Sequence, residues 1–194
     1  MTAFVLATAN PHKTDEMRTV LEPLGVELLE RPVSVPDVDE TGDTLEENAL
    51  LKARALVAAT GEAAIADDTG LFVDALDGRP GVRSARYAGE TASYDDNVTK
   101  LLDELDAVPA PRTARFVTVI AVAYADATAF CVAGELMGVI TTARAGDQGF
   151  GYDPVFAPHE GEGRTLAQLT PREKNDLSHR GRALRALREE LTRR

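Results

Sequence analysis

The strongest strand signals in the chain lie in RFVTVIAVAYADATAFCVAGELMGVI, residues 115–140. Residues 115–125 and 128–140 are rich in β-branched and apolar side chains, and a short turn separates them, which predicts a long antiparallel hairpin. Elsewhere, strand-like runs alternate with helical patterns, as at residues 3–7 and the helical repeat that follows and stops at Gly25. The sequence therefore predicts an α/β fold with a mixed sheet that contains this hairpin.

The composition argues against several classes of protein. The chain has 194 residues, with 21 Lys and Arg against 32 Asp and Glu, and a formal net charge of −11. A generic binder of nucleic acid or of an anionic membrane should carry the opposite sign, so we expect neither partner. We expect a cytoplasmic protein, because no run approaches membrane-spanning length and the first residues do not resemble a signal peptide. The single cysteine, Cys131, excludes an intrachain disulfide.

The junction of the first strand and first helix, VLATANPHKTDEMR at residues 5–18, could bind an anion. Asn10 is a good N-cap, and Pro11 suits the first helical position. The free N–H groups and positive dipole end of a helix N-terminus attract phosphate, and Lys13 adds a full positive charge. An ordinary N-cap beside a solvated lysine would produce the same pattern, and the chain has no Walker-type GxxxxGK[ST] loop.

A pair of aspartates forms the second candidate site. The run AAIA at residues 63–66 predicts a buried strand that breaks at Asp67 and Asp68, which would place both carboxylates at its C-terminal edge. Adjacent side chains of an extended segment point to opposite faces, so we expect one of the two to face a cleft. A carboxylate there could bind Mg²⁺ or accept a proton from water. The alternative is a turn that uses Asp and Gly for conformational reasons.

An acidic loop, residues 34–44, precedes a helix expected at about residues 45–60. Thr44 and Glu47 form a capping box that opens this helix. The loop carboxylates could bind a hard cation, although their spacing is not that of an EF-hand, and a solvated acidic loop is the alternative. Lys52 lies on this helix and could either bind a ligand or form a surface salt bridge.

Two later motifs could bind a nucleobase. The glycine-rich loop GDQGFGYDPVF, residues 146–156, carries Phe150, whose ring offers a stacking surface. Aromatic side chains packed beneath the loop would give the same pattern. Lys174, His179 and Arg180 form a basic cluster of hydrogen-bond donors that could recognise a keto oxygen. An ordinary basic C-terminal region is the alternative.

The order of these motifs resembles the noncanonical purine nucleoside triphosphate pyrophosphatases, the inosine and xanthosine triphosphatases of the Ham1-like family. The resemblance covers nearly the whole chain, through the blocks VLATANPHK, EENALLKA, AIADDTGL, PGVRSARYAGE, GFGYDPVF and LTPREKNDLSHRG. It implies one domain over residues 1–194, elongated, with two lobes around a central cleft and no separate linker, and it implies a homodimer. It also implies Mg²⁺-dependent hydrolysis of ITP, dITP and XTP to the monophosphate and pyrophosphate, which would cleanse the nucleotide pool.

The resemblance further implies roles for individual residues. Asp68 would be the catalytic base linked to the metal, and the second metal ligand would be Asp39 or Glu40. Residues 8–13 and Lys52 would hold the triphosphate, and Thr69 would contact the substrate. The residues that would surround the base are 150–153, Lys174, His179 and Arg180. The full set of expected substrate-binding residues is Thr8, Ala9, Asn10, Pro11, His12, Lys13, Lys52, Thr69, Phe150, Gly151, Tyr152, Asp153, Lys174, His179 and Arg180.

Departures from the family pattern are small. Ala9 stands where many relatives have Gly, and Thr69 where many have Ser.

Other functions stay open at this point. A related enzyme could cleave modified pyrimidine or methylated nucleoside triphosphates by the same chemistry. A nucleotide sensor would keep the lysines and aromatics without needing the carboxylates, and an acidic protein-interaction domain would need none of these residues.

Overall fold

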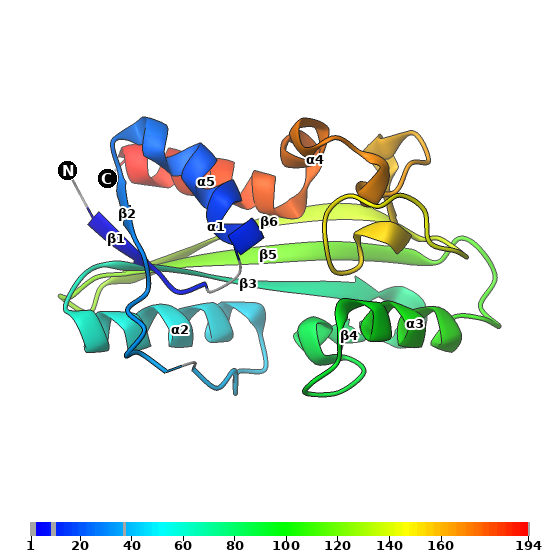
Figure 1. The fold of residues 1–194 in the computed structure, drawn as a ribbon, viewed down its shortest axis with the longest axis horizontal. Helices are drawn as coiled ribbons and strands as arrows, with labels where there is room; N and C mark the ends of the chain where they lie inside the picture. The colour runs from blue at the N-terminus through cyan, green and yellow to red at the C-terminus, as the bar shows by residue number, and fades with distance from the viewer. Residues whose placement is uncertain (1–2, 9–10, 37, 194) are drawn as a thin grey trace. The chain divides into compact units, whose positions relative to one another are not determined.

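The computed structural model describes residues 3–8, 11–36 and 38–193 and shows the expected α/β fold with a mixed sheet (Figure 1). The strands are β1 (Ala3–Leu6), β2 (Glu27–Leu29), β3 (Ala64–Val73), β4 (Pro80–Gly81), β5 (Thr113–Ala123), β6 (Ala129–Ile140) and β7 (Phe156–Pro158). The α-helices are α1 (Pro11–Leu21), α2 (Leu45–Thr60), α3 (Tyr94–Glu104), α4 (Pro171–Leu177) and α5 (His179–Arg193). Short 3₁₀ turns lie at η1 (Glu22–Leu24), η2 (Asp74–Leu76), η3 (Ser84–Arg86), η4 (Asp153–Val155), η5 (His159–Gly161) and η6 (Leu166–Gln168).

The sheet follows the order β2-β1-β3-β5-β6-β7, and β4 pairs with β3. β1 runs parallel to both β2 and β3, whereas β4 is antiparallel to β3 and β7 is antiparallel to β6. This combination confirms the mixed sheet. β5 and β6 are neighbours in the sheet and are joined by residues 124–128, while their pairing as an antiparallel hairpin stays a prediction.

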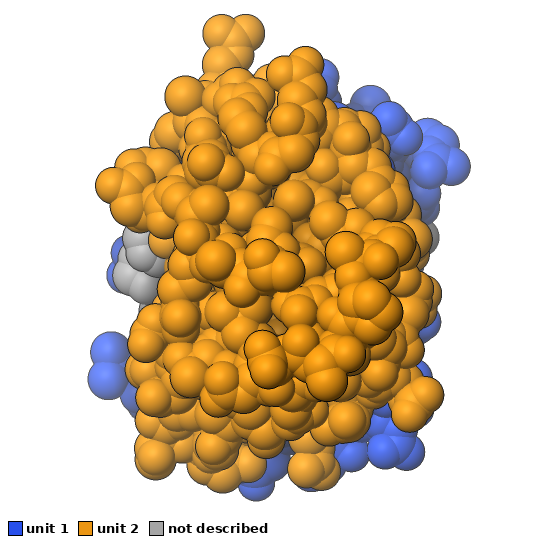
Figure 2. All heavy atoms as spheres, turned by 90° about the vertical axis from the view of Figure 1, so that its right-hand side faces the viewer, with its two compact units in different colours: residues 1–68, 118–134, 180–194 blue, residues 69–117, 135–179 orange. Residues whose placement is uncertain are grey.

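The chain divides into two compact units, which Figure 2 colours separately. Unit 1 comprises residues 1–68, 118–134 and 180–194, and unit 2 comprises residues 69–117 and 135–179. Each unit thus combines segments that are far apart in the sequence. The two-lobed shape around a cleft and the single domain over residues 1–194 stay predictions.

In unit 1, helices cover both faces of the sheet, with α1 and α5 on one face and α2 on the other (Figure 1). Phe4 of β1 packs in a cluster with Met17 of α1 and Leu184 of α5. The next residue, Val5, belongs to a separate cluster with Leu56 of α2. This division follows from the alternation of side chains along a strand, and it gives β1 two buried faces.

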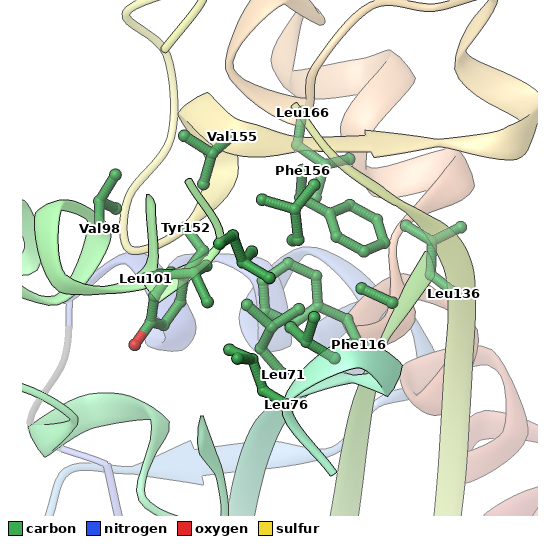
Figure 3. Close-up of a cluster of buried hydrophobic side chains, with 14 of the residues drawn as sticks. Leu71, Leu76, Val98, Leu101, Phe116, Leu136, Tyr152, Val155, Phe156 and Leu166 are labelled. Atoms are coloured by element: carbon green, nitrogen blue, oxygen red, sulfur yellow. The ribbon is translucent and has the colours of Figure 1, made fainter. Parts of the chain in front are cut away.

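Unit 2 has its own hydrophobic core, drawn in Figure 3. Leu101 from α3 lies in this cluster with Phe116 from β5, Leu136 from β6 and Phe156 from β7. The rings of Phe116 and Phe156 are 4.7 Å apart between centroids. The core therefore fixes α3 against three strands of the sheet.

The expectation that the strand at residues 63–66 breaks at Asp67 is wrong, because β3 continues to Val73. Its parallel pairing with β1 ends at Leu6 and Ile65, but antiparallel pairing with β4 then involves Leu71 and Phe72. Backbone pairing on both sides of the aspartates keeps this segment extended despite their low strand propensity. The aspartates consequently lie inside β3 but just beyond the end of β1.

None of the helices in the described part of the chain is both long and apolar enough to cross a membrane.

The capping box of α2 gives a first prediction, since both of its hydrogen bonds form. The Glu47 N–H donates to Thr44 Oγ1, and the Thr44 N–H donates to Glu47 Oε2, each at 3.1 Å. Replacement of Thr44 by alanine should lower the free energy of unfolding by about 1 kcal/mol, because an N–H at the helix start loses its acceptor. Urea denaturation followed by circular dichroism measures this loss.

The matched control is Thr44→Ser, which keeps the hydroxyl and should stay within a few tenths of a kcal/mol of the wild type. Equal stability of the alanine variant and the wild type would show that the capping box contributes nothing.

Candidate active site

The two adjacent aspartates of β3 are both buried, and the described ion pairs tie them to different helices. Asp67 is 3% exposed and Asp68 is 6% exposed. Asp67 lies within ion-pair distance of Lys13 on α1, whereas Asp68 lies within ion-pair distance of Lys52 on α2. Because α1 and α2 cover opposite faces of the sheet, the alternation expected for adjacent strand residues is present (Figure 1).

The Asp67 carboxylate lies among positive charges. Its Oδ2 is 2.8 Å from Lys13 Nζ and 3.6 Å from Arg180 Nε. Burial raises the pKa of Asp67, but the Lys13 and Arg180 cations outweigh that effect and hold the pKa well below its usual range. Asp67 is therefore ionised at neutral pH and compensates two buried or half-buried cations.

Arg180 also donates from Nη1 to Glu16 Oε2 at 2.9 Å, so its guanidinium joins α5 to α1. Sequence reasoning missed Glu16. Its spacing of three residues from Lys13 on one helix was the available signal, since such residues share a face. The resemblance placed Arg180 near the base, and the structure engages it with two carboxylates of unit 1. Its role in base binding stays a prediction.

Lys52 joins two carboxylates on the other side of β3. Its Nζ donates to Asp68 Oδ1 at 3.0 Å and to Glu40 Oε1 at 2.9 Å. Burial tends to lower the pKa of Lys52, but Asp68, Asp67 and Glu40 raise it above its ordinary value. Burial raises the pKa of Asp68, and the nearby Lys52 only partly opposes this. The cluster thus holds one cation between two carboxylates.

The residues of this cluster fit a divalent cation. Asp68 Oδ2 is buried and has no hydrogen-bond partner among the described residues, so an oxygen ligand is left over. Mg²⁺ is typically bound by one or two carboxylates, with phosphate oxygens and waters completing its shell. Asp68 and Glu40 match that requirement, and the described residues contain no group of three or more His, Cys, Asp or Glu that could hold a metal alone.

The acidic loop before α2 is held against the first turns of that helix, which sequence reasoning did not anticipate. The Gly42 N–H donates to Oδ1 of the buried Asn48 at 2.8 Å. A Cβ on Gly42 would collide with Asn48 and Glu47, so only glycine fits there. These contacts fix the loop two residues after Glu40. Asp39 as the second metal ligand stays a prediction.

Several expected phosphate-binding residues can be placed only in part. Thr8 follows β1 and is half-buried, and Thr69 follows Asp68 on β3. Ala9 and Asn10 lie outside the described residues. Pro11 and His12 begin α1, but their side chains lie outside what the structure describes.

Phe150, Asp153 and Lys174 come together in unit 2. The Phe150 N–H and Lys174 Nζ both donate to Asp153 Oδ2, each at 2.7 Å. The same ammonium lies 4.6 Å from the centroid of the Phe150 ring. Gly149 has φ +79°, and a Cβ there would collide with the Asp153 carboxylate. The loop therefore holds a partly exposed aromatic ring beside a buried ion pair, with Gly151 on its other side at φ +63°.

Two other expected base-binding side chains are buried. His179 is 4% exposed and stacks on Phe116, with ring centroids 4.4 Å apart and planes 13° apart. The Tyr152 ring lies in the core of unit 2, and its O–H donates to the Ser84 carbonyl at 2.9 Å (Figure 3). Burial raises the pKa of Tyr152. The Tyr152 ring is thus a core element, and its contact with a base stays a prediction.

Comparison with known proteins relates this arrangement to a family. The profile of the Ham1 family matches residues 4–190. The chain belongs to the Ham1 family. This Ham1-family protein is 48% identical to the dITP/XTP pyrophosphatase of Geobacter sulfurreducens over 194 residues, covering 98% of this chain and 97% of that protein. It is also 48% identical to the dITP/XTP pyrophosphatase of Streptomyces coelicolor over 192 residues, covering 96% of each.

Solved structures agree with this family membership. A HAM1 protein from Coxiella burnetii superposes with a TM-score of 0.93 at 41% identity, and the match covers 100% of both chains. A nucleoside-triphosphatase, dITP/XTP pyrophosphatase, from Mycobacterium abscessus superposes with a TM-score of 0.79 at 45% identity, covering 96% of this chain and 97% of that one. The fold of this Ham1-family protein is therefore that of its relatives over essentially the whole chain.

The charges around Asp67 predict a pH-dependent stability. The ordinary pKa of an aspartate is 3.8, and that of Asp67 is lowered in the folded state. Its ion pairs are fully present above about pH 4, and their contribution is lost as the pH falls through the folded-state pKa. Asp67→Asn leaves Lys13 and Arg180 without this carboxylate and should cost about 3–5 kcal/mol at pH 7. Urea denaturation at several pH values between 7 and 2.5 measures both effects.

The matched control is Asp15→Asn, which changes an exposed aspartate of α1 and should cost less than about 0.5 kcal/mol. The interpretation fails if Asp67→Asn keeps the wild-type stability at pH 7, or if its stability falls as steeply in acid as that of the wild type.

Proposed function

We propose that this protein hydrolyses noncanonical purine nucleoside triphosphates, namely ITP, dITP and XTP, to the nucleoside monophosphate and pyrophosphate, with Mg²⁺ as cofactor. The observation that carries the proposal is the arrangement of cations on both sides of β3, with Lys13 at Asp67 and Lys52 between Asp68 and Glu40. The names of relatives at 48% identity over nearly the full chain support the same activity.

The chain's own cations bind the triphosphate. Lys13 lies in the first turn of α1, where the helix N-terminus also favours an anion. Lys52 is already desolvated and is held in place by two carboxylates, so its ammonium is preorganised for a phosphate oxygen. This local arrangement lets a protein with a net charge of −11 bind a polyanion.

Asp68 acts as the base. Its Oδ1 is engaged by Lys52, so its buried Oδ2 carries both proposed roles, as a ligand of the cation and as the acceptor of a proton from the attacking water. The water attacks the α-phosphorus, the bond from this phosphorus to the α–β bridging oxygen breaks, and pyrophosphate leaves. Burial raises the pKa of Asp68, which makes the carboxylate a better proton acceptor. When bound by Asp68 and Glu40, Mg²⁺ would polarise the phosphate oxygens and offset their charge.

The residues around Phe150 select the base. The partly exposed Phe150 ring gives a purine a surface for stacking. Lys174, held by Asp153, and the buried His179 are donors suited to the 6-keto oxygen of hypoxanthine or xanthine. Adenine presents a 6-amino group instead, and buried donors left unpaired discriminate strongly against such an analogue. Homodimerisation and a cytoplasmic location stay predictions.

A substrate panel tests the activity. Release of pyrophosphate from ITP, dITP, XTP, GTP and ATP is measured with Mg²⁺ and with EDTA. We expect kcat/KM for ITP, dITP and XTP to exceed that for ATP by at least about 100-fold, because donors aimed at a keto group are unpaired with adenine. Activity should disappear with EDTA. Release of orthophosphate, or equal cleavage of ATP, would contradict the proposal.

A substitution of the base tests the mechanism. Asp68→Asn should lower kcat for ITP by about 10²–10⁴-fold, because an amide cannot accept the proton. The fold should survive, since burial already disfavours the charged form of Asp68. Thermal unfolding by circular dichroism checks this, and Asp106→Asn, at an exposed position after α3, serves as control. A normal kcat in Asp68→Asn would exclude Asp68 as the base.

A further inference from the structure

The segment that carries Phe150 is held to Asp153 through its backbone, but it has glycine on both sides. Gly149 and Gly151 flank the ring, and both have positive φ angles, +79° and +63°. The Asp153 hydrogen bond fixes the backbone of Phe150 and not its side-chain torsions, so the orientation of the ring also depends on the side chains that contact it. The Lys174 ammonium, 4.6 Å from the ring centroid, is one such contact.

A second contact comes from the first turn of α3. The ring of Tyr94 lies 6.0 Å from the ring of Phe150 between centroids, with an interplanar angle of 39°. Tyr94 is 48% exposed, which is unusual among the large hydrophobic side chains of the described residues. The Tyr94 ring thus contacts the Phe150 ring from the solvent-exposed side of α3.

α3 is rigidly held and can therefore serve as a support. Val98 and Leu101 on its inner face lie in the core of unit 2 together with Tyr152, only two residues after Phe150 (Figure 3). The helix start is closed by a capping box between Ser93 and Asp96. Tyr94 is thus presented from an anchored helix turn.

A separate ion pair ties the beginning of the same loop to the same helix turn. Arg144 Nη2 is 3.0 Å from the Asp95 carboxylate and donates to Thr99 Oγ1 at 2.7 Å. It also donates to the Asp95 carbonyl at 3.2 Å. The loop is therefore tied to α3 through Arg144 and Tyr94.

We propose that Tyr94 is a positioning residue for the Phe150 ring and, through it, for the purine base of the substrate. The inference rests on the proposed function for the identity of the ligand. Without the Tyr94 ring, Phe150 samples more orientations, so a base loses part of its stacking partner. The triphosphate contacts of Lys13 and Lys52 do not involve Tyr94, so binding of a base-free polyphosphate is not affected.

The experiment compares the wild type with Tyr94→Ala, Tyr94→Phe and, as control on the last turn of α3, Asp103→Ala. Steady-state hydrolysis of ITP gives KM and kcat, and competitive inhibition by inorganic tripolyphosphate gives a Ki that reports on the phosphate site alone. For Tyr94→Ala we expect KM for ITP to rise about 2–10-fold, with kcat and the tripolyphosphate Ki within about 2-fold of the wild type. Tyr94→Phe and Asp103→Ala should match the wild type.

Each outcome separates the two proposals. An unchanged KM in Tyr94→Ala, with an active wild type, overturns the role of Tyr94 and leaves the proposed function standing. A parallel rise of KM and of the tripolyphosphate Ki also overturns it, because a general structural defect would explain both. If the wild type neither hydrolyses ITP nor binds IMP in calorimetry, the proposed function fails, and the role of Tyr94 fails with it.

Discussion

The structure depends on the neutralisation of two adjacent buried carboxylates. Asp67 and Asp68 lie side by side in β3, where water is largely excluded, and neither charge could be kept there without a partner. Lys13 and Arg180 compensate Asp67, while Lys52 compensates Asp68. Adjacent side chains of a strand point to opposite faces of the sheet. For this reason α1 and α5 supply the cations next to Asp67, and α2 supplies the cation next to Asp68. One dipeptide thus has charge partners on three helices that also pack on the sheet through their apolar faces.

The short length of β1 determines where the aspartates lie relative to the parallel part of the sheet. It has only four residues, and its pairing with β3 ends at Leu6 and Ile65. The aspartates come directly after this point, next to the start of α1. In open α/β sheets in general, ligands bind beyond the carboxyl ends of parallel strands. A longer β1 would have continued its pairing with β3 alongside the aspartates.

Much of the fold could be predicted from the sequence because its signals are local. The capping box of Thr44 and Glu47, the helix after it and the strands around residues 115–140 depend on neighbouring residues alone. The extent of β3 could not be predicted, because the pairing partners that keep Asp67 and Asp68 extended lie elsewhere in the chain. The contact of Arg180 with Glu16 joins residues 164 positions apart, and no local pattern reports it. The burial of the Tyr152 ring could not be predicted for a similar reason, since a glycine-rich loop does not reveal which of its aromatic rings enters the core.

The Lys52 ammonium contacts both Asp68 and Glu40. The effect on stability of replacing one carboxylate therefore depends on whether the other is present. Loss of either carboxylate alone still leaves the Lys52 ammonium one of its two contacting counterions. Loss of both would remove the two carboxylates that contact this buried cation. The loss in free energy of unfolding should then exceed the sum of the losses from the separate changes. The stability effects of replacing Asp68 and Glu40 are therefore expected to be non-additive.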